Sequence, residues 1–128
     1  MKKIIVLFLF IWLFVPSLCL GIDTINENSS AVLRLTWKDA DSVLTIPTSF
    51  KCRIDDLSSG TVIRAITEIL PLASSYDLTI TSSENRIIAS ARSYEQRKVT
   101  IQWYVGSTLV GTADYKYKVI NLKHVPFP

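Results

Sequence analysis

Apolar and polar residues alternate along five stretches of this chain, at residues 31–37, 49–54, 75–81, 98–105 and 113–120. Such alternation is typical of β-strands buried on one face, because successive side chains of a strand point to opposite faces. The stretches are rich in β-branched and aromatic residues, which suit a half-buried sheet. The residues predicted to point inward are Leu33, Leu35, Trp37, Phe50, Cys52, Ile54, Tyr76, Leu78, Ile80, Val99, Ile101, Trp103, Tyr115, Tyr117 and Val119.

Three weaker strands are expected at residues 43–46, 61–65 and 86–91, and turn-forming residues separate most of the stretches. About seven or eight short strands at this spacing, without a helical period, predict an all-β fold. We expect an antiparallel two-sheet sandwich over residues 31–122. The segment 64–70 is the one competitor for a helix, and it is equally consistent with an apolar connection.

The N-terminus has the pattern of an export signal, with two lysines followed by a continuous apolar run at residues 4–20. A basic start, an apolar helix and small residues before a cleavage site mark a secretory signal peptide. We expect residues 1–21 to form that signal, with cleavage between Gly21 and Ile22. A retained membrane anchor is the alternative, because a largely apolar run of 17 residues is at the lower limit for crossing a bilayer.

Cleavage would leave a nearly neutral chain. Two of the 14 Lys and Arg residues precede residue 22, so twelve remain against 11 Asp and Glu. This balance does not indicate a nucleic-acid partner. Cys52 would be the single remaining cysteine, and its inward position predicts a buried free thiol, with an intermolecular disulfide as the alternative. Residues 22–30 are polar and predict a flexible lead-in, and residues 123–128 are expected to form a C-terminal tail.

The sequence offers few groups for catalysis. Its only histidine, His124, is in the tail, so no Ser–His or Cys–His pair is expected. Asp39, Asp41, Asp55 and Asp56 occur in two turns and could bind calcium, but aspartates commonly cap turns and that interpretation is favoured. We therefore expect a non-enzymatic domain without a metal or another cofactor.

Lys116 and Lys118 fall on the predicted outward side of the last strand. With Arg97 and Lys98 they are expected to form a short basic stripe. Because charges on the solvent face of a strand usually maintain solubility and block edge pairing, these lysines are weak binding candidates. Tyr104 is a third weak candidate, since single exposed aromatic residues are common.

Two segments resemble parts of known sandwich domains. LRLTW at residues 33–37 resembles the Trp-bearing early strand of fibronectin type III modules, and TEILPLASSYDLTIT at residues 67–81 resembles their leucine, turn and tyrosine crossing. The general layout resembles an immunoglobulin or fibronectin type III sandwich. The Cys-Trp-Cys core of antibody domains is absent.

A second resemblance covers residues 47–122. Five strings are similar to a group of small phage-encoded β-sandwich proteins: PTSFKCRIDDLSSGTVI, ASSYDLTI, ENRII, YEQRKVTIQW and YKYKVINL. The resemblance implies a phage or prophage accessory or virion-surface protein, and it carries over no catalytic residue. Virion components are normally assembled in the cytoplasm, so the signal peptide favours a product sent to the cell envelope.

These observations predict an exported, non-enzymatic binding or structural module that contacts a protein or glycan surface. We expect it to be secreted or located in the periplasm or cell envelope, with the virion as the alternative location. It would contact the membrane only through residues 4–20, if the signal is retained. A bacterial periplasmic or secreted adhesion-type domain is the second hypothesis, and an enzyme built from loop carboxylates is the third.

Overall fold

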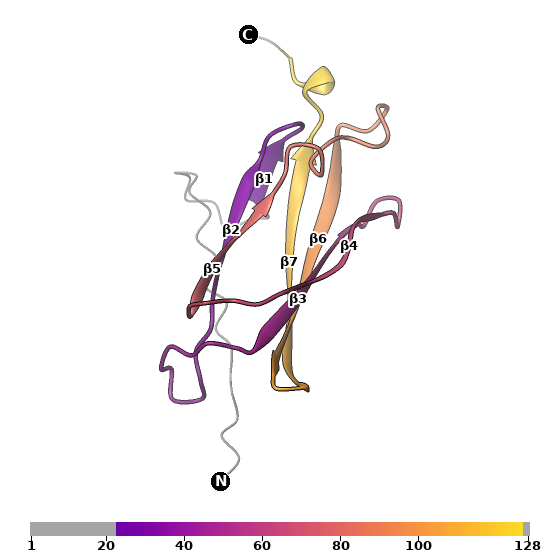
Figure 1. Cartoon of the computed structure of the whole chain (residues 1–128). Coiled ribbons are helices and arrows are strands. Elements are labelled where there is room, and N and C mark those ends of the chain that lie inside the picture. Colours follow the sequence, from indigo (N-terminus) through magenta and orange to yellow (C-terminus); the bar gives the residue numbers. More distant parts are fainter. Residues whose placement is uncertain (1–22, 127–128) are drawn as a thin grey trace.

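The computed structural model describes residues 23–126, which form an all-β domain (Figure 1). The predicted signal peptide and its cleavage point between Gly21 and Ile22 lie outside these residues. Within 23–126, no helix has the length and apolar character needed to cross a membrane. The elements are β1 (Asp23–Asn26), β2 (Ala31–Thr36), β3 (Ser49–Asp56), β4 (Val62–Ile69), β5 (Ser75–Ile80), β6 (Tyr94–Val105), β7 (Thr108–Ile120) and a 3-10 turn, η1 (Leu122–His124).

The strands divide into two sheets. A five-stranded sheet has the order β1-β7-β6-β3-β4, and a two-stranded sheet pairs β2 with β5. All neighbouring strands are antiparallel except β1 and β7, which run parallel with Asp23 opposite Tyr117. The prediction of an entirely antiparallel sandwich is therefore wrong at this one strand pair. The β6–β7 hairpin turns at Gly106, whose φ of 62° is readily adopted by glycine.

One hydrophobic core is shared by the two sheets. All residues that the alternation predicts as inward are buried except Tyr76, which is half-buried. The ring of Phe50 on β3 has its centroid 5.1 Å from that of Trp37 and 5.1 Å from that of Tyr76 on β5, so aromatic contacts join the sheets. Burying a large apolar side chain contributes about 1.5–3 kcal/mol. The predicted strand faces are therefore confirmed.

Three short segments differ from the prediction. Residues 23–26, expected within the flexible lead-in at 22–30, form β1 because they pair with the last part of β7. Residues 43–46 were expected to form a strand and make only one isolated bridge, between Lys38 and Leu44. Residues 86–91 are irregular rather than a strand.

Strand β4 forms one edge of the five-stranded sheet. It includes the predicted strand at 61–65 from Val62 onward and continues to Ile69, so the ambiguous segment is mostly a strand. Its pairing with β3 shifts register twice between Cys52 and Asp55. Such bulges discourage an exposed edge from pairing with another chain.

Candidate functional site

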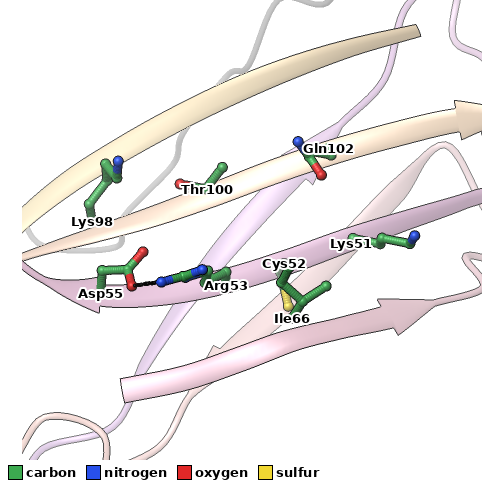
Figure 2. Close-up of a pocket in the computed structure, with 8 residues that line it drawn as sticks. All are labelled: Lys51, Cys52, Arg53, Asp55, Ile66, Lys98, Thr100 and Gln102. Carbon is green, nitrogen blue, oxygen red and sulfur yellow. Dashed lines mark hydrogen bonds and ion pairs between the residues drawn. The ribbon is translucent and has the colours of Figure 1, made fainter. Parts of the chain in front are cut away.

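The outward side of the five-stranded sheet carries polar residues (Figure 2). On β3 and β6 these residues alternate with buried core residues, so the period of two places them together on one side. The strand register brings them into neighbouring positions. We call this surface the polar face, and it comprises Lys51, Arg53, Asp55, Glu68, Lys98, Thr100, Gln102, Tyr104, Thr112, Asp114, Lys116 and Lys118.

The register arranges the polar face in rows across the strands. In one row Asp55 is opposite Lys98, and Lys98 is opposite Lys116. In the next row Arg53 is opposite Thr100, which is opposite Asp114. The structure thus groups the predicted candidates Tyr104, Lys116 and Lys118 with polar residues of β3. The sequence pattern does not predict this grouping.

A shallow hollow of about 350 Å³ lies on the polar face. In Figure 2, Lys51 marks one end of it, and Lys98 and Asp55 mark the other. Lysine, arginine, threonine and glutamine side chains supply most of its hydrogen-bonding groups. The hollow is lined by Lys51, Cys52, Arg53, Asp55, Ile66, Lys98, Thr100 and Gln102.

The cations of the polar face have different surroundings. Arg53 Nε donates to Asp55 Oδ1 at 2.9 Å. The Lys51 ammonium lies 5.0 Å from the ring centroid of Tyr104, within cation–π range. Among the described residues, no carboxylate oxygen lies within 4.0 Å of the ammonium of Lys98 or Lys116. The Lys118 ammonium lies 4.7 Å from the ring centroid of Tyr94. Within residues 23–126, Lys98 and Lys116 are therefore the two cations of the polar face that have neither an ion pair nor an aromatic ring against them, and they are left to meet an external anion.

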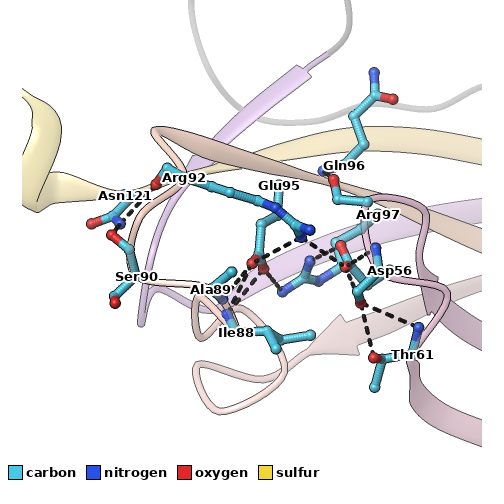
Figure 3. A network of polar contacts seen from close by, with 12 residues as sticks. Asp56, Thr61, Ile88, Ala89, Ser90, Arg92, Glu95, Gln96, Arg97 and Asn121 are labelled. Carbon is cyan, nitrogen blue, oxygen red and sulfur yellow. Dashed lines mark hydrogen bonds and ion pairs between the residues drawn. The ribbon is translucent and has the colours of Figure 1, made fainter.

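A cluster of charged residues lies buried on the opposite side of the same strands (Figure 3). Arg97 was predicted to belong to the exposed basic stripe, and this was wrong, because its side chain is completely buried. Its guanidinium donates from Nη1 to Asp56 Oδ1 and from Nη2 to Glu95 Oε2, the second at 2.9 Å. Glu95 and Arg97 have the same strand parity as Val99, so the alternation itself could have placed them inside.

This charged cluster holds the irregular segment 86–92 against the sheet. The Glu95 carboxylate accepts hydrogen bonds from the backbone N–H groups of Ile88 and Ala89, at 3.0 Å and 2.7 Å. Arg97 Nη2 donates to the carbonyl of Arg86 at 2.9 Å. Charge-assisted hydrogen bonds of this kind are about twice as strong as neutral ones. The cluster is consequently a structural support rather than a site open to a ligand.

Arg64 and Glu84 form a half-buried ion pair that joins β4 to the segment after β5. The two N–O distances of this bidentate pair are 2.5 Å and 2.6 Å, and Arg64 also donates to the Thr79 carbonyl at 2.8 Å. Burial acts to raise the pKa of Glu84, but hydrogen bonds from Arg64 and Thr81 outweigh it and lower that pKa below its ordinary value. The pair therefore stabilises the ionised carboxylate.

Two tyrosines of β7 donate hydrogen bonds inside the domain. Tyr117 Oη donates to Asn85 Oδ1 at 3.0 Å, and Tyr115 Oη donates to Asp23. Burial raises the pKa of both phenols far above the usual value, and in Tyr115 the hydrogen bond to Asp23 adds to this. Both tyrosines remain protonated donors at neutral pH.

The residues considered for metal binding are not brought together. Asp39 Oδ1 accepts from the N–H groups of Asp41 and Val43, at 2.9 Å and 3.0 Å, which is ordinary turn capping. Asp55 pairs with Arg53, and Asp56 belongs to the buried cluster. Within residues 23–126, no group of three or more His, Cys, Asp or Glu residues could hold a metal ion.

Neither His124 nor Cys52 takes part in a catalytic pair in the described part of the chain. His124 Nε2 lies 3.0 Å from the carbonyl oxygen of Ser90. Cys52 is a free cysteine with 1% exposure, and its sulfur lies 3.9 Å from Arg64 Nη1. The thiol therefore belongs to the core.

A second surface lies at the end of the domain that carries the β6–β7 hairpin. The segments 43–49, 70–74 and 105–111, which include the ends of β3, β6 and β7, contain no charged residue. Trp37 links the segments 43–49 and 70–74 through its backbone. Its N–H donates to the Ser74 carbonyl at 2.9 Å, and its carbonyl accepts from the Thr45 N–H at 3.0 Å. We call this surface the apolar end, and its exposed side chains are Val43, Leu44, Ile46, Leu70, Leu72, Val105 and Leu109.

Comparison with known proteins identifies no relative of this chain. No family model, no curated protein and no solved structure matches the chain.

Proposed function

We propose that this protein is an exported, non-enzymatic binding module and that the polar face is its contact surface. The observation that carries the proposal is the hollow between Lys51 and Lys98, built from side chains on paired strands. Paired strands present such groups in a fixed arrangement, and rigid presentation reduces the entropy lost on binding. The partner would be a protein or glycan surface.

Strand order supports an immunoglobulin-like layout for this module. In such sandwiches strands C, F and G are neighbours in one sheet, and strands B and E are neighbours in the other. Here β3, β6 and β7 are neighbours, and β2 pairs with β5. Many unrelated binding proteins use this arrangement, so the strand order supports the type of fold only. The identity of the partner must be inferred from the residues of the polar face.

The resemblance of residues 47–122 to small phage-encoded sandwich proteins supports a phage or prophage accessory role. The apolar run at 4–20 supports action outside the cytoplasm, in the secreted fraction, the periplasm or the cell envelope. A virion-surface protein is the alternative location. A bacterial adhesion-type domain is the second candidate, because it would need the same export signal and the same exposed face.

Cell fractionation with N-terminal sequencing tests the export part of the proposal. The chain is expressed in a bacterium with its own N-terminus, and we expect Ile22 as the first residue of a product in the periplasm or medium. An intact Met1 in the membrane fraction would indicate a retained anchor. An intact Met1 in cytosol or purified phage particles contradicts export.

Charge reversal tests the contact surface. Lys98→Glu should weaken retention of the exported protein on isolated cell envelopes or phage particles by about tenfold, the loss expected for one charge-assisted contact. Lys123→Glu makes the same charge change on η1, away from the polar face, and should leave retention unchanged. Equal retention of both variants contradicts the proposed surface.

A further inference from the structure

We propose that the polar face binds an acidic glycan, with a negative group of the saccharide held between Lys98 and Lys116. This inference rests on the proposed function and names the chemical class of its ligand.

Two like charges are directly opposite each other on the polar face. Lys98 on β6 and Lys116 on β7 are partners in the strand register, so their side chains leave the same side of the sheet. Like charges directly opposite on neighbouring strands destabilise a sheet. β6 pairs with β7 on one side and with β3 on the other, so Lys98 does not protect a sheet edge. An anion bound between the two ammonium groups would remove the repulsion.

Nearby carboxylates do not neutralise Lys98 and Lys116. Asp55 is the residue opposite Lys98, but Asp55 Oδ1 accepts from Arg53 Nε at 2.9 Å. Asp114 is opposite Thr100, one row away. The face as a whole has five cations and three carboxylates, or a net charge of +2, from Lys51, Arg53, Lys98, Lys116 and Lys118 against Asp55, Glu68 and Asp114.

The hollow also offers neutral hydrogen-bonding groups. Thr100 and Gln102 offer hydroxyl and amide groups between the Lys98 end and the Lys51 end of the hollow, and these groups match the hydroxyl groups of a sugar (Figure 2). Lys116 is opposite Lys98 on β7, next to the hollow and outside its lining. Its volume of about 350 Å³ lies at the lower end of the range for small-molecule sites. A shallow hollow of this size suits one part of a saccharide chain that continues across the open sheet.

The same hollow is a poor match for other acidic partners. Protein interfaces centre on buried apolar and aromatic residues, whereas Ile66 is the one large aliphatic side chain in its lining. Single-stranded nucleic acid needs aromatic platforms for its bases, and the lining contains no aromatic residue. A glycan carrying carboxylates or phosphates fits the cations and the hydroxyl and amide groups together.

The test uses the product obtained by expressing the full chain with its own N-terminus. Oligomers of polygalacturonate serve as the acidic glycan. Lys98→Gln should raise the Tm of the unliganded protein by about 1–3 °C, because it removes the like-charge opposition. The same variant should bind polygalacturonate about tenfold more weakly than the unaltered protein. Lys123→Gln is the matched control and should change neither property.

Two further probes decide the ligand class. Neutral dextran should not bind, and polyglutamate should bind more weakly than polygalacturonate. The inference is overturned if Lys98→Gln lowers the Tm, if it leaves polygalacturonate affinity unchanged, or if dextran or polyglutamate binds as tightly. Should polygalacturonate fail to bind while Lys98→Glu still weakens envelope retention about tenfold, the glycan class is wrong and the proposed contact surface stands.

Discussion

Two acid–base pairs lie side by side on β3 and β6 and have opposite environments. Asp56 is opposite Arg97, and Asp55 is opposite Lys98, one residue away on each strand. The first pair is fully buried and joined by a direct ion pair. In the second, Lys98 has no direct ion pair to Asp55, which binds Arg53 instead. The pleat alone separates them, because adjacent residues point to opposite sides of a sheet.

Charged residues therefore have two separate roles in this domain. Inside, two carboxylates and one guanidinium fix an irregular connection to the sheet through hydrogen bonds. Outside, the lysines face solvent and remain available to a partner. Removing one member of a buried ion pair leaves an uncompensated charge, whereas an exposed charge is solvated by water. Substitutions of buried and of exposed charges should therefore change stability by different amounts.

The largest effect is expected at Arg97. Arg97→Met removes the buried guanidinium and leaves Asp56 and Glu95 without their main partner, so the free energy of unfolding should fall by about 3–5 kcal/mol. Urea denaturation followed by fluorescence measures this change. Lys98→Met, the neighbouring position on the polar face, should shift the same quantity by less than about 0.5 kcal/mol. Similar losses in both variants would contradict the distinction between the two sides.

An intermediate, pH-dependent effect is expected at Glu84. Because the folded state lowers the pKa of this carboxyl, its contribution to stability is complete above the unfolded pKa of about 4.3 and is lost as the pH falls through the lower folded value. Glu84→Gln should therefore lose less stability than the unaltered protein as the pH is lowered from 6 to about 3. Denaturation at several pH values tests this. An unchanged pH dependence would show that Arg64 does not stabilise the Glu84 carboxylate.

Among the variants that break an ion pair, the smallest effect is expected at Asp55. Asp55→Asn breaks a partly exposed pair with Arg53, and such pairs contribute at most about 1 kcal/mol. The unfolding free energy should fall by less than that, and the difference should shrink further in 1 M salt. A loss as large as that of Arg97→Met would mean that the two sides of the sheet are equivalent.

Much of the fold could be predicted from the period of two alone. The five alternating stretches became β2, β3, β5, β6 and β7, because a strand with one apolar side is stable only when that side faces a core. Strand β1 was missed since Ile25 is its only buried residue and its hydrogen bonds depend on where β7 ends. Pairing between distant segments leaves little local signal in so short a strand.

The failed strand at 86–91 has a specific cause. Its apolar residues suggest a strand, but Glu95 takes the N–H groups of Ile88 and Ala89 that would otherwise join a sheet. Glu95 itself was not singled out. A buried carboxylate on β6 is visible only from its parity with Val99 and Ile101, and side-chain capping of a distant backbone cannot be deduced from composition.

The candidate surface was partly predictable. Lys116, Lys118 and Tyr104 were placed on outward positions, and the structure puts all three on the polar face. Their grouping with Lys51 and Arg53 requires the register between β3 and β6, which the sequence pattern does not specify. Alternation assigns a residue to a side of its strand, and register decides its neighbours across the sheet.

The parallel arrangement of β1 and β7 has a mechanical consequence. A pull on the two ends of the domain in opposite directions draws β1 and β7 lengthwise past each other, since the chain enters at Asp23 and leaves after Ile120. The hydrogen bonds between the two strands then carry the force together, in shear, instead of separating one by one. The bond from the Leu122 N–H to Glu27 Oε1, at 2.8 Å, reinforces this junction beyond the last strand residues. A module held at one end and loaded at the other would thus transmit tension through its outermost strand pair before the core is disturbed.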